Sequence, residues 1–169
     1  MSLVTYDGLV ELVERGVIEG VDPARINAAS IDVTLGQFAW IEDPKGGLVW
    51  LAKKQGPGLL KRDLTGDPLY LNPGAFALAQ TRETFNLPDH IACEFRLKSS
   101  GARAGLDQAL AVWVDPGFTG SVLTLELRNN LQDHTLVLEY GMPIGQLVFW
   151  QGDRVPEHRS YRTVGQYNN

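Results

Sequence analysis

The sequence predicts a mainly β protein, either a β-barrel or a β-sandwich, with one short helix at its N-terminus. Short runs rich in alternating or β-branched residues occupy much of the chain after residue 22. Turn sequences such as Asn72-Pro73-Gly74 and Asp115-Pro116-Gly117 separate these runs. Many short strands divided by such turns are typical of closed or two-layered sheets. We therefore expect one β domain that covers residues 1–169.

The N-terminal helix is expected within residues 5–17. Its apolar residues at helical spacing are Leu9, Leu12, Val13 and Val17. Asp7 is suited to cap the start of this helix, and Gly20 follows soon after its end. One amphipathic helix therefore opens the domain.

Seven segments are predicted to be strands: residues 31–41, 75–80, 91–97, 109–114, 121–128, 135–140 and 146–150. Residues 43–69 are rich in glycine and proline, which interrupts the strand pattern. We expect a long excursion from the sheet there. The sequence shows neither an internal repeat nor a second domain.

The composition argues against several classes of function. The 169 residues carry a net charge of -5, which argues against the basic surface that a nucleic-acid polymer requires. The single cysteine, Cys93, cannot form an intramolecular disulfide, and no window approaches the ~20 apolar residues of a membrane span. No secretory leader is evident. We expect a cytoplasmic protein that could still bind a nucleotide, because one triphosphate needs only a local cluster of cations.

Four residues near position 100 are suited to bind phosphate. Lys98, the hydroxyls of Ser99 and Ser100, and Arg103 can all donate hydrogen bonds to phosphate oxygens, and the two cations offset the phosphate charge. The serines are equally suited to a turn before Gly101, and Arg103 to a solvated surface. The residues alone leave these interpretations open.

Glu126 is a candidate site carboxylate on a predicted strand. On its predicted strand, Leu123, Leu125 and Leu127 share one face, and Val122, Thr124, Glu126 and Arg128 share the other. Because carboxylates are rarely buried, the pattern alone favours a solvated glutamate. Asp115, which begins the sequence D-P-G-F, is suited to a turn in any β protein.

Six motifs follow one another in the order of a known family. They are S-I-D-V-T-L-G at residues 30–36, L-N-P-G-A-F-A-L-A at 71–79, K-S-S-x-x-R at 98–103, V-D-P-G-F-T-G at 114–120, L-E at 125–126 and G-M-P-I-G-Q-L at 141–147. With them the chain resembles the dCTP deaminases, a trimeric branch of the dUTPase-like superfamily. The resemblance implies a distorted β-barrel or jelly roll, and a homotrimer with its sites between subunits.

The resemblance also implies catalytic roles. Glu126 would be the general acid and base, which takes a proton from the water that attacks C4 of cytosine and delivers it to N3 and the departing ammonia. The backbone carbonyl of Ala111 would orient that water, and Ser99 would approach both the base and the phosphates. Arg103 would reach across a subunit boundary into the neighbouring site.

Further substrate contacts are implied by the same resemblance. Asp115 would bind the deoxyribose 3'-hydroxyl, and Gln146 would lie near the sugar and phosphates, although an edge-strand amide is the simpler interpretation of Gln146. The other residues implied in substrate binding are Lys98, Ser99, Ser100, Arg103, Trp113, Val114, Thr124, Leu125, Glu126, Tyr161 and Gln166. Trp113 would lie beside the pyrimidine.

One departure from the family pattern concerns the base pocket. The family's L-x-H-x-T-A stretch is here L-D-Q-A-L-A and is one residue shorter. A residue near Gln108 replaces the histidine, and Leu110 replaces the threonine. Two hydrogen-bonding groups of the base pocket are therefore changed, and a modified cytosine could be admitted.

A second departure concerns the C-terminus. Tyr161 and Tyr167 match the family's tail, but Gln166 stands where a lysine is usual. One cation that would face the triphosphate is therefore missing. Four cations of the excursion could compensate or could form a solvated basic patch: Lys53, Lys54, Lys61 and Arg62.

The expected reaction is hydrolytic deamination of dCTP to dUTP and ammonia. The alternatives are a dUTPase, a bifunctional dCTP deaminase and dUTPase, a deaminase of a modified dCTP, and a non-catalytic nucleotide-binding relative. One cysteine and three dispersed histidines do not provide the ligands of a zinc deaminase, so no zinc is expected. Mg²⁺ is expected only through the nucleotide triphosphate.

Overall fold

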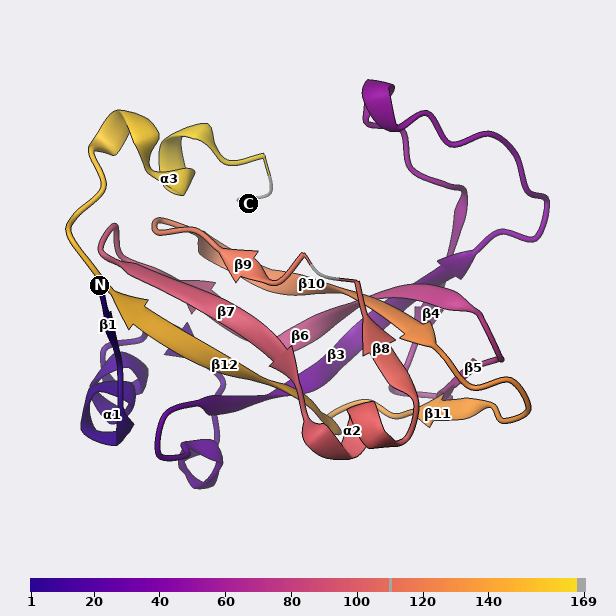
Figure 1. Ribbon diagram of the computed structural model, residues 1–169, viewed down its shortest axis with the longest axis horizontal. Helices are drawn as coiled ribbons and strands as arrows, with labels where there is room; N and C mark the ends of the chain where they lie inside the picture. The colour runs from indigo at the N-terminus through magenta and orange to yellow at the C-terminus, as the bar shows by residue number, and fades with distance from the viewer. Residues whose placement is uncertain (110, 167–169) are drawn as a thin grey trace.

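The computed structural model describes residues 1–109 and 111–166. Within these residues, one strongly twisted antiparallel sheet dominates the molecule (Figure 1). Its strand order is β8 (Leu106–Gln108), β10 (Thr119–Asn129), β6 (Phe76–Asn86), β3 (Ile31–Glu42), β12 (Pro143–Gln151), β7 (Ile91–Leu97) and β9 (Trp113–Val114). The mainly β fold class is therefore confirmed.

Shorter elements complete the fold. Three strands pair beside the main path, namely β1 (Ser2–Leu3) with β12, β2 (Ile18–Glu19) with β6, and β4 (Leu59–Asp63) with β3. A separate pair consists of β5 (Leu69–Leu71) and β11 (Leu136–Leu138). The helices are α1 (Tyr6–Glu14), α2 (Ser99–Arg103) and α3 (Tyr161–Val164), with 3₁₀ turns η1 (Pro23–Arg25), η2 (Leu51–Lys53) and η3 (Glu157–Arg159).

Alternating burial along the strands builds the core. The fully buried side chains of the sheet include Ile31, Val33, Leu35, Ala77, Ala79, Leu127 and Phe149. One carboxylate, Glu83, lies among them, and it accepts hydrogen bonds from the backbone N–H and the hydroxyl of Thr34 at 2.9 and 2.7 Å. Because its oxygens are satisfied, this buried polar group connects β6 to β3 instead of destabilising the core.

Helix α1 begins one residue before the predicted cap. Thr5 occupies the N-cap position. Asp7 lies in the first turn, where its negative charge interacts favourably with the positive end of the helix dipole. Leu9 and Leu12 are buried as the helical spacing predicts. The expectation that Asp7 caps the helix was therefore wrong, while the helix itself is confirmed.

Of the predicted strand at residues 109–114, only Trp113–Val114 is a strand among the described residues, and this difference determines how the sheet closes. Strand β8 ends at Gln108, β9 begins at Trp113, and the N–H of Ala111 donates to the carbonyl of Ala109 at 2.6 Å. β8 and β9 stand at opposite ends of the strand order. The link between Gln108 and Trp113 can span at most roughly 18 Å. The sheet must therefore curl until its two edges approach each other.

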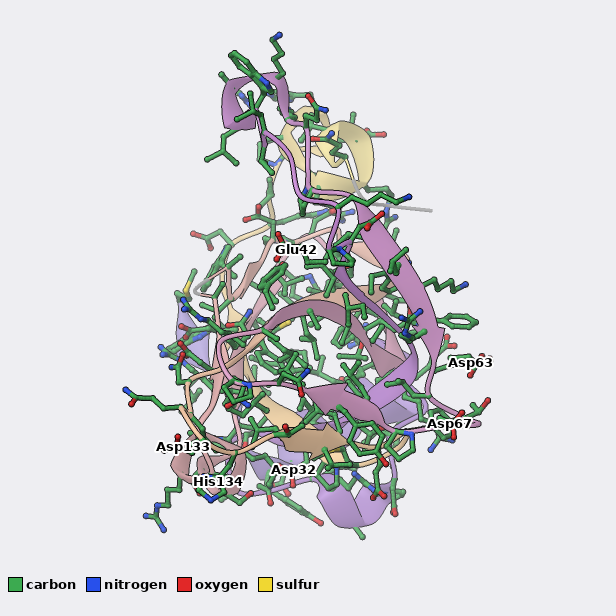
Figure 2. The ribbon with its side chains drawn as sticks, turned by 90° about the vertical axis from the view of Figure 1, so that its right-hand side faces the viewer. Asp32, Glu42, Asp63, Asp67, Asp133 and His134 are labelled. Carbon is green, nitrogen blue, oxygen red and sulfur yellow. The ribbon has the colours of Figure 1, made fainter. Side chains whose placement is uncertain are left out.

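The excursion at residues 43–69 is in part a strand. β4 pairs with the second half of β3, from Phe38 opposite Asp63 to Glu42 opposite Leu59. The part before β4, residues 43–58, is called the arm here, and Figure 2 shows it projecting beyond Glu42, the last residue of β3. The side chains of Leu48 and Leu51 in the arm are exposed. In the described part of the chain, no helix is long and apolar enough to cross a membrane.

Candidate active site

A pocket of about 830 Å³ lies where the two edges of the sheet approach each other. It is lined by the link between β8 and β9, by β10 and by the segment after β12, residues 152–166, which is called the tail here. Nine residues predicted for the site line it: Ala111, Trp113, Val114, Asp115, Thr124, Leu125, Glu126, Tyr161 and Gln166. The curl of the sheet therefore creates the concave surface that a nucleotide requires.

Glu126 is the half-buried carboxylate of the pocket. Burial is the main influence on this group, and it raises the pKa of Glu126 above the usual range of a glutamate. The burial pattern of β10 confirms the two predicted faces, with Leu123, Leu125 and Leu127 buried beneath the strand. The interpretation of Glu126 as a freely solvated side chain is therefore wrong.

Gln108 holds Glu126 in place. Its amide Nε2 donates to Glu126 Oε2 at 2.9 Å, and the Gln108 side chain is buried. This hydrogen bond favours the ionised carboxylate and so opposes the effect of burial on the pKa of Glu126. The sequence indicated Gln108 only as the replacement of a histidine. Its partner could not be predicted, because β8 itself was missed.

Another part of the pocket wall carries a polar pair. The indole Nε1 of Trp113 donates to Asp115 Oδ1 at 2.9 Å. Phe118 N–H donates to the carbonyl of Asp115 at 3.3 Å, so Asp115 is both a turn former and a lining residue. Its carboxylate can accept a hydrogen bond from a ligand hydroxyl. Leu110, which was expected to replace the family's threonine in the base pocket, lies outside the described residues.

The tail is attached beside this wall. Ser160 donates to Asp89 Oδ1 at 2.6 Å and accepts from Arg162 N–H as the cap of α3. A Cβ at Gly117, where φ is +88°, would lie 2.1 Å from Ser160 Oγ, so only glycine allows this approach. The ring of Tyr161 packs on Phe118 with centroids 5.6 Å apart and reaches the pocket.

The second group of predicted residues does not line the pocket. Lys98, Ser99, Ser100, Arg103 and Gln146 are absent from its lining. The two serines and Arg103 are exposed on α2, so the residues that were considered turn formers are helical. Figure 1 shows α2 at the lower edge of the molecule and α3 above the sheet.

Lys98 and Gln146 have other partners. Lys98 Nζ contacts Asp32 Oδ2 at 2.5 Å, and Gln146 accepts from the hydroxyl of Ser30 at 3.3 Å. Figure 2 shows Asp32 at the end of the molecule opposite the arm. The described residues contain no group of three or more histidine, cysteine, aspartate or glutamate side chains arranged to hold a metal ion.

Comparisons with known proteins agree with this geometry. A family model described as dCTP deaminase-like matches residues 5–152. The chain is 37% identical to the "dCTP deaminase, dUMP-forming" of Methanospirillum hungatei over 165 residues, which cover 91% of this chain and 83% of that protein. It is 41% identical to the protein of the same name from Acidothermus cellulolyticus over 148 residues, which cover 85% and 76%. The chain therefore belongs to the dCTP deaminase family.

A solved structure shares the fold. The crystal structure of 2'-deoxycytidine 5'-triphosphate deaminase from Agrobacterium tumefaciens matches with a TM-score of 0.70 and 19% sequence identity. The match covers 89% of this chain and 48% of that chain, so this chain spans about half the length of that protein. The family membership predicted from the six motifs is confirmed.

Proposed function

We propose that the protein deaminates dCTP by hydrolysis, with Glu126 as the general acid and base. The observation that carries the proposal is the half-buried carboxylate with its raised pKa at the wall of a nucleotide-sized pocket. A carboxyl group with a pKa nearer neutrality exchanges protons more readily at physiological pH than a solvated one. The assignment is further supported by the names of the relatives.

The proton balance requires only Glu126 and water. The ionised carboxylate accepts a proton as water attacks C4 of cytosine, and the proton then passes to N3. A second proton transfer from the new C4 hydroxyl through Glu126 lets the amino group leave as ammonia. The hydrogen bond from Gln108 fixes the orientation of the carboxylate during both transfers. The backbone carbonyl of Ala111, at the same pocket, is proposed to orient the water.

We propose that the phosphate-binding part of the site comes from a second copy of the chain. The described lining includes the carboxylates Asp115 and Glu126 but neither lysine nor arginine. A triphosphate needs cations and donors, and α2 presents Ser99, Ser100 and Arg103 to solvent. A closed homotrimer would bring α2 of one copy to the pocket of the next.

The names of the relatives give a different product from the one expected from the sequence. We expected dUTP, whereas the relatives are named dUMP-forming. We therefore propose that this protein also releases pyrophosphate, so that dCTP and two waters give dUMP, ammonia and pyrophosphate. This reaction corresponds to the bifunctional alternative, a combined dCTP deaminase and dUTPase. The cytoplasmic location remains a prediction from the sequence.

Mg²⁺ is proposed to bind through the nucleotide. Asp115 and Glu126 are the carboxylates of the described lining, and Trp113 and Gln108 already donate to them. Mg²⁺ prefers several waters and phosphate oxygens, so this lining suits a metal that arrives with the triphosphate. Bound in that way, the ion would offset phosphate charge.

Product identification tests the proposed function. The purified protein is incubated with dCTP, dUTP and 5-methyl-dCTP in the presence of Mg²⁺, and nucleotides, ammonia and pyrophosphate are quantified. Equal amounts of dUMP, ammonia and pyrophosphate from dCTP are expected. Accumulation of dUTP would contradict the pyrophosphate step alone, and nucleotide binding without ammonia would indicate a non-catalytic relative. Turnover of 5-methyl-dCTP would show that the altered stretch at residues 106–111 admits a modified base.

A further inference from the structure

The pocket contains two carboxylates, yet its proposed ligand carries a highly charged triphosphate. Neither lysine nor arginine is part of the described lining. Gln166, at the end of the described tail, is exposed and is part of the lining. A cation that reaches Gln166 would therefore place positive charge at the lining of this pocket.

The cations in and near the arm differ in their contacts. Lys53 lies over the ring of Trp50, 4.5 Å from its centroid, and Lys61 lies over Phe38 at 3.4 Å. Lys45 approaches Asp43 at 3.9 Å. Each of these ammonium groups already has a partner in the arm or on the adjoining strands, so none is directed at the tail.

Lys54 differs from its neighbours because its ammonium crosses to the tail. Its Nζ donates to Gln166 Oε1 at 3.3 Å, a contact between residues 112 positions apart. The arm and the tail both rise above the sheet in Figure 1. This contact brings the Lys54 ammonium to within one hydrogen bond of a residue that lines the pocket.

The backbone of Lys54 is also distinctive. Among the non-glycine residues that the structure describes, Lys54 is the one with a positive φ, 53° with ψ 31°. This left-handed conformation is disfavoured for lysine and ends the 3₁₀ turn η2. Glycine or asparagine would adopt it more readily, so the local backbone does not account for a lysine at this position.

We propose that Lys54 is a substrate-binding residue, which the arm places over the pocket to bind the outer phosphates of the nucleotide. The inference rests on the proposed function and deepens it. Without nucleotide, Lys54 donates to Gln166; with nucleotide, a phosphate oxygen replaces the amide oxygen as a stronger, charged acceptor. The arm therefore supplies the cation that the tail lacks at Gln166.

Binding measurements on a Glu126→Gln background test this role without turnover. Titration calorimetry compares dCTP with dCMP, which lacks the outer phosphates, for added Lys54→Gly, Lys54→Arg and Lys53→Ala changes. Lys54→Gly removes the cation and accepts the positive φ, so the fold should be retained. Lys53→Ala is the matched control, because it removes an equal charge from the neighbouring position of the arm.

The expected pattern is specific. Lys54→Gly should weaken dCTP binding roughly tenfold, the lower end of the range for a hydrogen bond to a charged group, and should leave dCMP binding unchanged. Lys54→Arg and Lys53→Ala should stay within about twofold of the background protein. Equal weakening by Lys54→Gly and Lys53→Ala, or no weakening by Lys54→Gly, would overturn the role of Lys54 while the proposed function stands. Absence of dCTP binding in the background protein itself would overturn both.

Discussion

Glu126 and Arg103 are both predicted catalytic residues, but their side chains lie in different environments. Glu126 is half-buried on β10, the neighbour of the edge strand β8, and its carboxylate is hydrogen-bonded to Gln108. Arg103 is exposed at the end of a short helix outside the pocket. A proton-transfer group needs a fixed environment to tune its pKa, and one chain provides that. A phosphate-binding cation needs only to reach its ligand, and a second chain can provide it.

The largest effect is expected from Glu126→Gln. Glutamine has nearly the same shape as glutamate but cannot accept and deliver protons. The rate of ammonia release should therefore fall by a factor of about 10² to 10⁴. Nucleotide affinity should be retained. Steady-state ammonia production and calorimetry measure the two quantities, and ammonia release within threefold of the unchanged protein would remove Glu126 from this role.

The same variant has an expected effect on stability. Because the folded-state pKa of Glu126 is raised, its stabilising contribution is present below the usual glutamate pKa and is lost as the pH rises through the raised value. A neutral glutamine does not incur this loss. Tm at neutral pH should therefore be unchanged or higher, which separates lost chemistry from lost folding.

Arg103→Ala tests whether the second half of the site comes from another copy. If Arg103 binds the phosphates in the neighbouring site, its removal should lower kcat/KM by roughly tenfold to a hundredfold. The decisive experiment mixes Arg103→Ala with Glu126→Gln chains under conditions of subunit exchange. In a randomly exchanged equimolar mixture of trimers, about a quarter of all sites would combine an intact Glu126 with an intact Arg103 of the neighbour.

Recovered activity in the mixture would therefore support a shared site. Mixtures as inactive as the separate variants would show that both residues act within one chain. Light scattering at the assay concentration provides the control, because an active monomer would contradict the trimeric arrangement.

Gln108→Ala should weaken the half of the site that one chain assembles. The lost hydrogen bond no longer favours the ionised carboxylate, so the pKa of Glu126 rises further. The acid limb of the pH profile of kcat/KM should move to higher pH. At pH values on this acid limb, activity should fall about tenfold. A pH profile distinguishes this from simple loss of structure, with Gln151→Ala on the exposed end of β12 as control.

Ser160→Ala should have a smaller effect, through the tail. It removes the hydrogen bond to Asp89 and the cap of α3, which should raise KM for dCTP about threefold to tenfold. Thr163→Ala, on the same helix, is the matched control. A KM equal to that of the control variant would show that the tail holds Tyr161 without this contact.

Asp89 predicts the pH dependence of the same attachment. The hydroxyl of Ser160 lowers the pKa of Asp89, so the stabilisation is present above the usual aspartate pKa and is lost as the pH falls through the lowered value. Limited proteolysis of the tail should therefore accelerate at acid pH. The acceleration should be smaller in Ser160→Ala, because the contact that responds to pH is already absent.

Removal of zinc should have the smallest effect. A zinc-specific chelator should leave activity unchanged when Mg²⁺ is supplied, because the proposed chemistry uses Glu126 and water. Atomic absorption of the purified protein is the accompanying measurement. Stoichiometric zinc that is lost together with activity would contradict the proposal.

The sequence by itself determined the fold class, the strand faces and the family. Alternation along β10 placed Glu126 opposite Leu125 and Leu127, because side chains of a strand point to alternate faces whatever the strand pairs with. The six motifs identified the family, and most of the residues they implied line the pocket. These properties are local, so they are readable from neighbouring residues.

Only the tertiary structure decided how the pocket is built. The run at residues 109–114 looks like one strand, yet its described strand, Trp113–Val114, lies at the opposite end of the strand order from β8, which no local pattern reveals. The curl of the sheet brings Gln108 to Glu126, and the arm brings Lys54 to Gln166. Such contacts join segments whose approach depends on strand order and on loops far apart in the chain. Their partners are therefore set by the path of the whole backbone and not by residue type or spacing.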